Sequence, residues 1–357
     1  MKIGIVTFQE TNNYGAVWQN YALQQAIIKR GHEAETIDYK SEYIGRPYRF
    51  SHLTNKGLFS YLFGVMGYII YLPRTKKCRE FRKKLFYSRA VKKADLSKLN
   101  EEYDCFITGS DQVWNHKLTG MDATYMLDFV TDKTKCNSFA ASVGLSCIEE
   151  EKQKEYKRLL EGYANITVRE KSARQLLEPI VGRDVETVSD PCVLLSYDEW
   201  SSVAKPMRPK NSYVVVYQLG VSADVVKLAK KIAKENNLKV VYVPFPVGSF
   251  GKGTWDVTAG NAELLGYIRD AAYVVTDSFH GTLLSIILNK QFFTKVSGTH
   301  AGVGSRIVDL LDGFGLSNRI ISDNLNHCDK IDYSAVNPLL EQRRTEAGNC
   351  LEKILSK

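Results

Sequence analysis

Short apolar strands alternate with helical segments along most of this chain, and that alternation limits the folds open to it. A strand at Lys2–Phe8 is followed by a helix at Ala16–Arg30 and a second strand at His32–Tyr39. The helix carries apolar residues roughly on one face, and Gly31 stands where a helix-ending glycine belongs. Parallel strands need such crossover helices, so this opening predicts a doubly wound α/β domain.

The same rhythm continues in two further groups of elements. The first group comprises expected strands at 103–108, 135–141, 166–168 and 185–188, with helices at 148–161 and 171–177. The second comprises expected strands at 213–217, 239–243, 273–276 and 292–294, with helices at 222–235, 262–270, 279–288, 305–311 and 338–355. The length of 357 residues suits about two domains. We therefore expect an α/β protein with two Rossmann-like domains facing a cleft (GT-B-like) and a C-terminal closing helix.

The expected domain boundaries follow from where this rhythm breaks. Residues 1–195 form the first domain, and residues 41–95 interrupt it as a basic and aromatic insertion. Residues 210–330 form the second domain, after a polar stretch that contains two prolines, and residues 335–357 form the closing helix.

The insertion concentrates the positive charge of the chain. Between Arg74 and Lys93 stand ten basic residues and one acidic residue, so this stretch carries +9 and the remainder carries −1 of the total of +8. The fifteen uncharged residues Leu58–Leu72 precede it, too few for a membrane span of about 20 residues. Two interpretations stay open: a helical insertion with a solvated basic face, or a surface at 56–93 that contacts an anionic membrane.

Composition excludes several other classes of protein. The first residues read as a strand and not as an exported leader. Seven dispersed cysteines without CxxC spacing predict reduced thiols in the cytoplasm and no metal site. Because the charge outside one segment is near neutral, we expect no nucleic-acid partner.

Ligands of open α/β sheets bind at the carboxyl ends of the strands, so the informative residues should follow predicted strands. The first such place is the loop around Asn13, where the helix start can offer backbone amides; a mere turn and helix cap is the alternative. The second holds Ser110, Asp111 and Trp114. There Asp111 could act as an acid or base and an exposed Trp114 could stack on a sugar, or Ser110 or Asp111 could simply cap a helix.

Two more places follow strands later in the chain. Arg169 could grip a carboxylate or phosphate bidentately, although an ion pair with Glu170 or Asp190 would explain it equally well. His280 stands in the first turn of a helix that Ser278 can cap. Helix amides there can hold a phosphate and the histidine can donate a proton, although a lone histidine is usually structural.

Seven stretches of the chain resemble one known family, the polysaccharide pyruvyl transferases of bacterial capsule and cell-wall polymer synthesis. In chain order they are NNYGAVWQNYALQ at 12–24, FITGSDQVWN at 106–115, FAASVG at 139–144, TVREKSA at 167–173, SDPCVLL at 189–195, VVTDSFHGTLLSIILNK at 274–290 and SRIVDLL at 305–311. The combination of GSDQVWN with TDSFHGT is the most specific part of this resemblance. The insertion is the part of the chain that resembles the family least, so the resemblance says least about which acceptor is used.

The resemblance implies a transferase whose donor is phosphoenolpyruvate. Such an enzyme adds pyruvate as a cyclic ketal across two hydroxyls of a sugar and releases phosphate. It implies that Arg169 and His280 contact the donor and that Asp111 lies near the reacting centre. The roles of Asp111 and His280 as acid and base could be exchanged. The chemistry needs no cofactor beyond phosphoenolpyruvate as co-substrate, and no metal.

The full set of expected site residues falls into three groups. The catalytic candidates are Asp111, His280 and Arg169; the donor-binding candidates are Ser278, Phe279, Gly281, Thr282, Arg306 and Lys295; the acceptor-binding candidates are Asn13, Tyr14, Gln19, Ser110, Trp114 and Asn115. The expected partners are phosphoenolpyruvate and a sugar acceptor on a lipid-linked repeat unit. The expected location is the cytoplasm, with peripheral contact to the inner membrane face through 56–93 as a hypothesis.

Two alternatives from other classes stay open. One is a nucleotide-sugar-dependent glycosyltransferase or epimerase of the same architecture, because Thr276-Asp277-Ser278 is similar to the turn that such enzymes use for a nucleotide diphosphate. Leu283–Asn289 lacks the carboxylate that would bind the ribose, which weighs against this alternative. The other is a non-catalytic protein that binds a polymer or membrane through 56–93.

Overall fold

The computed structural model describes residues 1–9, 13–41, 43–44, 72–207, 210–220, 222–244, 253–296, 303–322 and 329–356. Most of the apolar run Leu58–Leu72 lies outside these residues. The chain divides into two compact units, and each is described by itself. The first unit contains residues 82–194 and both ends of the chain, and the second contains residues 195–342 together with residues 72–81.

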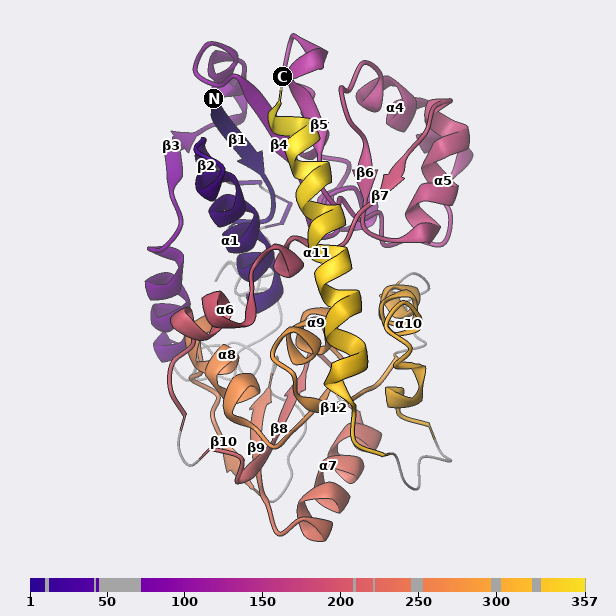
Figure 1. Cartoon of the computed structure of the whole chain (residues 1–357). Coiled ribbons are helices and arrows are strands. Elements are labelled where there is room, and N and C mark those ends of the chain that lie inside the picture. The colour runs from indigo at the N-terminus through magenta and orange to yellow at the C-terminus, as the bar shows by residue number, and fades with distance from the viewer. Residues whose placement is uncertain are drawn as a thin grey trace, which may run out of the picture. The chain divides into compact units, whose positions relative to one another are not determined.

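A parallel sheet forms the centre of the first unit. Among the described residues its strands are β1 (Lys2–Val6), β2 (Glu33–Tyr39), β3 (Tyr87–Val91), β4 (Cys105–Thr108) and β5 (Cys136–Ser138), in the order β3-β2-β1-β4-β5 (Figure 1). β6 (Thr167–Val168) pairs with β7 (Glu186–Thr187), and a bridge from Ala141 to Val168 joins this pair to the chain just beyond β5. This topology confirms the expected doubly wound pattern.

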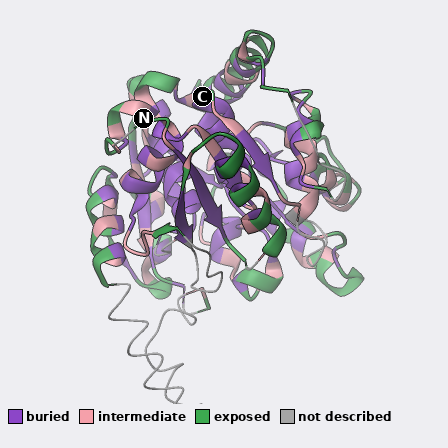
Figure 2. Cartoon of the chain, turned by 90° about the horizontal axis from the view of Figure 1, so that it is seen from below, coloured by how far each residue is buried: buried purple, intermediate pink, exposed green. Residues whose placement is uncertain are grey.

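Helices and short turns cover this sheet. The α-helices of the first unit are α1 (Tyr14–Lys29), α3 (His116–Thr119), α4 (Glu150–Leu160) and α5 (Lys171–Val181), and its 3-10 helices are η4 (Lys93–Glu101), η5 (Ala123–Met126), η6 (Lys133–Lys135) and η7 (Pro191–Leu194). Strands β1, β4, β5 and β6 are almost wholly buried, whereas the helices expose their outer faces (Figure 2). Gly4 of β1 leaves room for the neighbouring Phe106 ring, because a Cβ at this position would lie 2.9 Å from that ring.

The second unit repeats the plan with a different sheet. Within its described residues the strands are β8 (Tyr213–Gln218), β9 (Lys239–Pro244), β10 (Thr254–Trp255), β11 (Tyr273–Thr276) and β12 (Gln291–Thr294), in the order β10-β9-β8-β11-β12. Its helices are α6 (Tyr197–Val203), α7 (Ala223–Glu235), α8 (Asn261–Asp270), α9 (Phe279–Ile287), α10 (Val303–Asp312) and η8 (Ser317–Arg319). The strand cores are apolar because helices cover both faces of a parallel sheet.

The insertion and the last helix both divide between the units. The sequence predicts one insertion within the first domain, but residues 72–81 belong to the second unit, where the Lys77 ammonium donates to the Thr258 hydroxyl at 2.9 Å. Helix α11 (Tyr333–Leu355) contributes residues 333–342 to the second unit and residues 343–355 to the first. It is therefore shared between the units and is not a separate domain. None of the described helices is both long and apolar enough to cross a membrane.

β3 is the strand of the first unit that the sequence does not predict. Its residues lie within the expected insertion, and only Val91 among them is buried. The buried Gln24 of α1 joins this edge to the unit: its amide donates to the Phe86 carbonyl and accepts from the Phe86 amide, both at 2.8 Å. The Thr36 amide also donates to the Phe86 carbonyl, at 2.9 Å. The Gln24 side chain thus satisfies the two backbone groups of Phe86 as a neighbouring strand would.

We expect Gln24→Ala to loosen β3 more than it loosens the rest of the first unit. Loss of these bonds should cost about 1–3 kcal/mol, because buried backbone groups are left unsatisfied. Hydrogen exchange read by mass spectrometry should show faster exchange in residues 84–91. Gln25→Ala, one position away on the same helix, is the matched control and should leave that exchange unchanged. Equal exchange in both variants would contradict the role given to Gln24.

Candidate functional site

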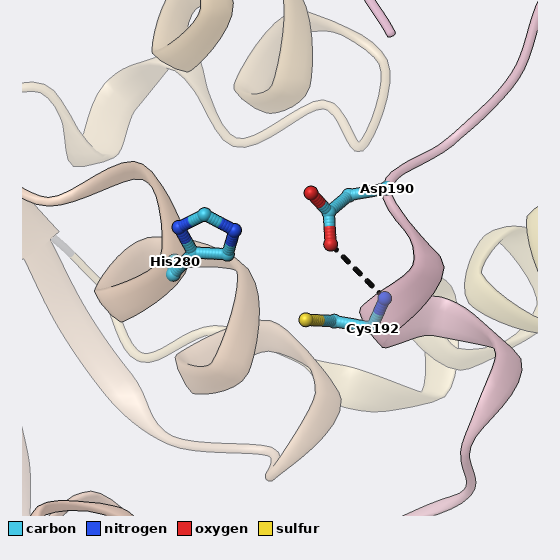
Figure 3. A group of neighbouring side chains, drawn as sticks. All are labelled: Asp190, Cys192 and His280. Carbon is cyan, nitrogen blue, oxygen red and sulfur yellow. Dashed lines mark hydrogen bonds between the residues drawn. The ribbon is translucent and has the colours of Figure 1, made fainter. Parts of the chain in front are cut away.

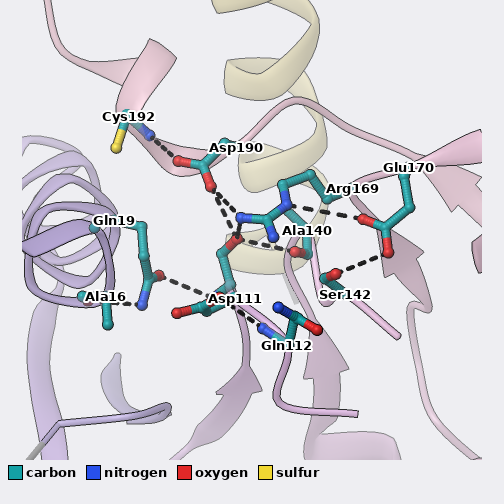
Figure 4. Close-up of polar contacts among 12 residues, drawn as sticks. Ala16, Gln19, Asp111, Gln112, Ala140, Ser142, Arg169, Glu170, Asp190 and Cys192 are labelled. Atoms are coloured by element: carbon teal, nitrogen blue, oxygen red, sulfur yellow. Dashed lines mark hydrogen bonds and ion pairs between the residues drawn. The ribbon is translucent and has the colours of Figure 1, made fainter. Parts of the chain in front are cut away.

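Buried polar side chains gather at the carboxyl ends of the strands of the first unit. We call Gln19, Ser110, Asp111, Arg169, Glu170 and Asp190 the polar cluster (Figure 4). Its members come from α1 and from the segments that follow β4, β6 and β7. Four of the six were expected as site residues, and the structure brings them together within this unit.

Gln19 closes the switch point of the first sheet, where β1 lies between β2 and β4. Its amide nitrogen donates to the Thr7 hydroxyl and to the Ala16 carbonyl, both at 2.9 Å. Its carbonyl oxygen accepts from the Ser110 amide at 2.9 Å. The Gln19 amide is fully used and fully buried. It therefore positions the Ser110 segment, and direct contact with an acceptor would break these bonds.

A buried ion pair lies at the centre of the polar cluster. The Arg169 Nη1 donates to Asp190 Oδ2 at 2.8 Å (Figure 4), and the other Asp190 oxygen accepts from the Cys192 amide at 3.0 Å (Figure 3). Burial alone would lower the pKa of the Arg169 guanidinium. The surrounding carboxylates, chiefly Asp190 and Glu170, outweigh burial and raise that pKa above its ordinary value. Arg169 is thus held charged, in the pair that the sequence left as an alternative to ligand binding.

Glu170 fastens the loop after β5 beside this ion pair. Its Oε1 accepts from the Ser142 hydroxyl at 2.8 Å and from the amides of Val143 and Gly144 at 3.2 and 3.3 Å. Its Oε2 lies 3.8 Å from the Arg169 Nε. One carboxylate therefore orders both the loop and the guanidinium.

Asp111 is a carboxylate of the polar cluster with one oxygen that is not engaged by its neighbours. Its Oδ1 accepts from the Gln112 amide at 2.9 Å, whereas its Oδ2 accepts no hydrogen bond from any residue that the structure describes. The residue has φ of 69°, a left-handed conformation that aspartate tolerates better than most side chains. It does not cap a helix. An oriented carboxylate with one open oxygen can accept a proton from a hydroxyl.

Several acceptor-binding candidates prove to be structural. Trp114 is fully buried, donates its indole N–H to the Tyr125 carbonyl at 3.1 Å and lies edge-on to Tyr163, so the expectation of an exposed, sugar-stacking Trp114 is wrong. Tyr14 is buried and stacks on Trp18. The alternative of a simple helix cap fits Asn13, whose side chain accepts from the Gly15 amide at 3.0 Å.

Asn115 completes this group of candidates. It caps α3 by accepting from the Lys117 amide at 3.1 Å, and its own amide donates to the Gln112 side chain at 2.8 Å. Its burial and its two bonds assign it to holding the loop after β4 in shape.

The charges of the polar cluster decide which ligand it suits. Three carboxylates, Asp111, Glu170 and Asp190, face one guanidinium, so the cluster carries a net charge of −2 when all are ionised. An anionic ligand would be repelled here, whereas neutral hydroxyl groups would find acceptors. The cluster therefore suits a polyol better than a phosphate.

In the second unit, Asp277 and Ser278 follow the end of β11, and α9 begins directly after them. The Ser278 hydroxyl accepts from the Gly281 amide at 3.2 Å and so caps the helix. His280 is the second residue of α9 and is largely buried (Figure 3). The start of a helix carries positive partial charge and amide donors, which suit a phosphate.

Other donor-binding candidates shape this helix start from within. A Cβ at Gly281 would lie 2.7 Å from the Thr276 hydroxyl and 3.0 Å from the Tyr217 ring, so only glycine lets α9 approach the sheet this closely. The fully buried Thr282 donates to the Ser278 carbonyl at 2.9 Å and lies 3.0 Å from the Thr294 hydroxyl. Thr282 therefore supports the helix start from the inside.

The cationic and aromatic candidates lie beside α9. The Phe279 ring is edge-on to His280 with ring centroids 5.3 Å apart, and the Arg306 guanidinium of α10 lies 5.9 Å from the same ring. Lys295 follows β12 and pairs with Asp224 at 2.7 Å in a partly exposed bridge. Such a bridge is weak, so Lys295 can exchange its partner for an anionic ligand.

Asp277 joins the two sides of the switch point of the second sheet. It follows β11, and its carboxylate accepts from the amides of Leu219 at 2.6 Å and Gly220 at 3.0 Å, both of which follow β8. Burial raises the pKa of Asp277 above its ordinary value, and these two bonds offset only part of that rise. Loop amides that could hold a ligand phosphate are therefore already occupied by the protein's own carboxylate.

The chain matches a known protein family over most of its length. The model of the family described as "Polysaccharide pyruvyl transferase" matches residues 13–295. This match spans most of the chain, and the chain belongs to the polysaccharide pyruvyl transferase family. A comparison with curated protein sequences finds no match.

Solved structures show the same fold at low sequence identity. A UDP-GlcNAc 2-epimerase from Methanocaldococcus jannaschii is 13% identical with a TM-score of 0.50, and the comparison covers 100% of this chain and 99% of that one. A UDP-GlcNAc 2-epimerase from Neisseria meningitidis, bound to UDP-GlcNAc, is 7% identical with a TM-score of 0.51 and 100% coverage of both chains. These likenesses establish the GT-B-like fold and nothing about the ligand.

Sequence reasoning gave Asp190, Glu170 and Asp277 no role in the site. Asp190 and Glu170 appeared only as alternative partners of Arg169, and Asp277 only as part of a turn. All three follow predicted strands, which is the signal that singled out the other candidates. That signal does not separate a carboxylate that meets ligand from one that holds its neighbours in place.

We expect Asp190→Ala to destabilise the protein strongly, because it leaves a buried guanidinium without its closest carboxylate. The loss should be about 3–5 kcal/mol, as for other broken buried ion pairs. Urea unfolding followed by circular dichroism measures it. Glu101→Ala, at an exposed carboxylate in the same unit, is the control and should stay within about 0.5 kcal/mol of the parent. Equal stability of the two variants would show that the Arg169–Asp190 pair is not a buried contact.

We also expect Asp277→Ala to release the loop after β8. Two backbone amides lose their acceptor, so their exchange with solvent should accelerate about tenfold or more. Hydrogen exchange at Leu219 and Gly220, resolved by NMR, tests this. The control is Asp224→Ala, which removes a nearby exposed carboxylate and should leave both amides unchanged. Unchanged protection in Asp277→Ala would refute the bridge.

Proposed function

We propose that the protein transfers the enolpyruvyl group of phosphoenolpyruvate to two hydroxyls of a sugar and leaves a cyclic pyruvate ketal. Membership of the pyruvyl transferase family supports the transfer of pyruvate. The observation that carries the proposal further is the division of charge. Cationic groups and helix amides gather at α9 in one unit, and carboxylates gather in the polar cluster of the other.

The donor fits the second unit by charge. Phosphoenolpyruvate carries a phosphate and a carboxylate, so it needs cations and N–H donors at two places. The first turn of α9 and His280 offer one place, and Arg306, whose guanidinium lies 5.9 Å from the Phe279 ring, offers a second. We assign the phosphate to α9 and His280, and the carboxylate to Arg306, with Lys295 as a further cation.

The reaction balances without an oxidant or reductant. Protonation of the enol methylene makes C2 electrophilic, and one sugar hydroxyl forms a C–O bond to it. The bond from C2 to the phosphate oxygen breaks, and the second hydroxyl closes the ring. The two hydroxyls lose two protons; one ends on the new methyl group and the other on phosphate. We assign the proton that leaves with phosphate to His280 and proton transfer at the acceptor to Asp111.

The acceptor fits the first unit for the complementary reason. A sugar brings neutral hydroxyls, and the open Oδ2 of Asp111 can accept one of them or take its proton. The remaining cluster residues hold Asp111 and its loop in place. We infer that the acceptor is a sugar of a polysaccharide precursor, and we propose a lipid-linked repeat unit as its form.

The first test is calorimetric titration of the purified protein with phosphoenolpyruvate and, separately, with uridine diphosphate. We expect phosphoenolpyruvate to bind and the nucleotide not to bind. His280→Gln and Arg306→Ala should each weaken binding by about tenfold to a hundredfold, because each removes a charge-assisted or polar contact to an anion worth about 1.5–3 kcal/mol. Lys230→Ala, at an exposed lysine of α7 in the same unit, controls for net charge and should bind as the parent does.

The outcomes separate the candidate functions. Binding of uridine diphosphate in place of phosphoenolpyruvate would refute the proposal and favour a nucleotide-sugar enzyme. Equal weakening by Lys230→Ala would show that overall charge, and not the α9 site, governs binding. Melting temperatures of all variants establish that a loss of binding is not a loss of folding.

A further inference from the structure

A large aromatic side chain stands exposed at the edge of the first sheet. Phe86, directly before β3, is 59% exposed, the largest exposed fraction among the large apolar side chains that the structure describes. β3 forms the outer strand of its sheet (Figure 1). An exposed phenylalanine forgoes the free energy that burial would provide.

The fold fixes this side chain outward. Three hydrogen bonds hold the Phe86 backbone: its amide donates to Gln24, and its carbonyl accepts from Gln24 and from the Thr36 amide. Leu85, one residue earlier, is buried. Neighbouring side chains of an extended segment point to opposite faces, so burial of Leu85 favours the outward position of Phe86. Moving the ring to the face that Leu85 occupies would require the backbone to turn over, which would break its bonds to the buried Gln24.

Positive charge surrounds this ring along the chain. Residues 82–93 contain six basic and no acidic residues. Arg89 and Lys93 pair with Glu102 and Asp122 in the same unit. Lys84 and Lys92 are exposed on either side of Phe86 in the sequence, and within the described residues neither has an acidic partner at ion-pair distance.

Protection of a sheet edge explains only part of this arrangement. Lysines on an outer strand discourage pairing with another sheet, so Lys84 and Lys92 could serve that purpose alone. An exposed phenylalanine has the opposite effect, because it invites association. An aromatic ring that exposed lysines flank in the sequence is instead a combination that suits the surface of an anionic bilayer, where the ring enters the interface and the ammonium groups meet lipid phosphates.

We infer that Phe86, Lys84 and Lys92 form a docking surface for anionic lipid, which we call the edge surface. Charge complementarity selects this occupant: the lysines have no acidic partner at ion-pair distance among the described residues, and the ring is held outward. The edge surface lies wholly within the first unit and involves none of the residues assigned to the reaction. Docking would place the unit proposed to bind the sugar acceptor at a membrane, and the inference stands whether or not the donor is phosphoenolpyruvate.

The test uses the full chain and vesicles of defined composition. In sedimentation with phosphatidylcholine vesicles that contain 30% phosphatidylglycerol (by design about one lipid in three), we expect the parent to bind at low salt. Phe86→Ser should weaken binding several-fold. Lys84→Gln with Lys92→Gln should weaken it by about tenfold to thirtyfold, since a lysine near an anionic surface contributes about 1 kcal/mol. Vesicles of phosphatidylcholine alone should bind little.

A matched control and a direct probe sharpen the test. Leu118→Ser removes another exposed apolar side chain of the same unit, 45% exposed, and should bind as the parent does. Phe86→Trp should show a blue shift of its added fluorescence on anionic vesicles, because the ring moves out of water. All these positions are exposed, so the variants should keep the parent melting temperature.

Defined outcomes would overturn the inference. Equal binding of the parent and Phe86→Ser, equal binding to neutral vesicles, or no blue shift in Phe86→Trp would each do so. Self-association that Phe86→Ser abolishes, without vesicle binding, would identify a second copy of the chain as the occupant. Retention of nucleic acid that depends on Lys84 and Lys92 would assign the edge surface to that polymer instead.

Discussion

The Arg169–Asp190 ion pair is the interaction on which the arrangement of the first unit depends. Both side chains are almost wholly buried, and a buried ion pair is seldom more stabilising than apolar residues of similar volume. Its presence is therefore better explained by what it holds. Asp190 reaches the amide of Cys192 and the hydroxyl of Ser110, so one carboxylate ties the ends of three chain segments together.

The two units place different side chains at the switch points of their sheets. Each sheet has a switch point at which a ligand crevice is expected. In the first unit Gln19, a neutral amide, spans that point and fixes Ser110. In the second unit the carboxylate of Asp277 spans it and occupies the amides of Leu219 and Gly220. Because both switch points are filled by side chains, the groups left to meet a ligand are those just beyond them, Asp111 and the start of α9.

Much of the fold could be predicted from the sequence, because buried parallel strands are near-continuous apolar runs. β11 lies at the expected residues, and β1, β8 and α9 differ from the expected ranges only at their ends. β3 could not be predicted in this way, since an edge strand buries little and carries charge. Helix α6 did leave a signal, the capping box of Ser196 and Glu199, but it stands where a link between domains was expected.

The candidate site could be predicted by position but not by role. Strand ends correctly located Asp111, Arg169 and His280, because topology alone brings those ends to one edge of each sheet. Burial and pairing depend on neighbours far along the chain, and no local pattern reports them. Trp114 shows this most clearly: its neighbours Asp111 and Asn115 are polar, yet its indole N–H is bonded to Tyr125 within the core.

The placement of charge gives the strongest reason to separate donor and acceptor. Moving the anionic donor to the polar cluster would place it against a net charge of −2 in a buried setting, where Coulomb repulsion is least screened. Moving the sugar to α9 would place a neutral ligand at a helix start, where the positive partial charge and the amide donors suit an anion. The assignment in which the anionic donor meets cations and the neutral sugar meets carboxylate acceptors is therefore the one with the lower electrostatic cost, and it keeps Arg169 in its ion pair with Asp190.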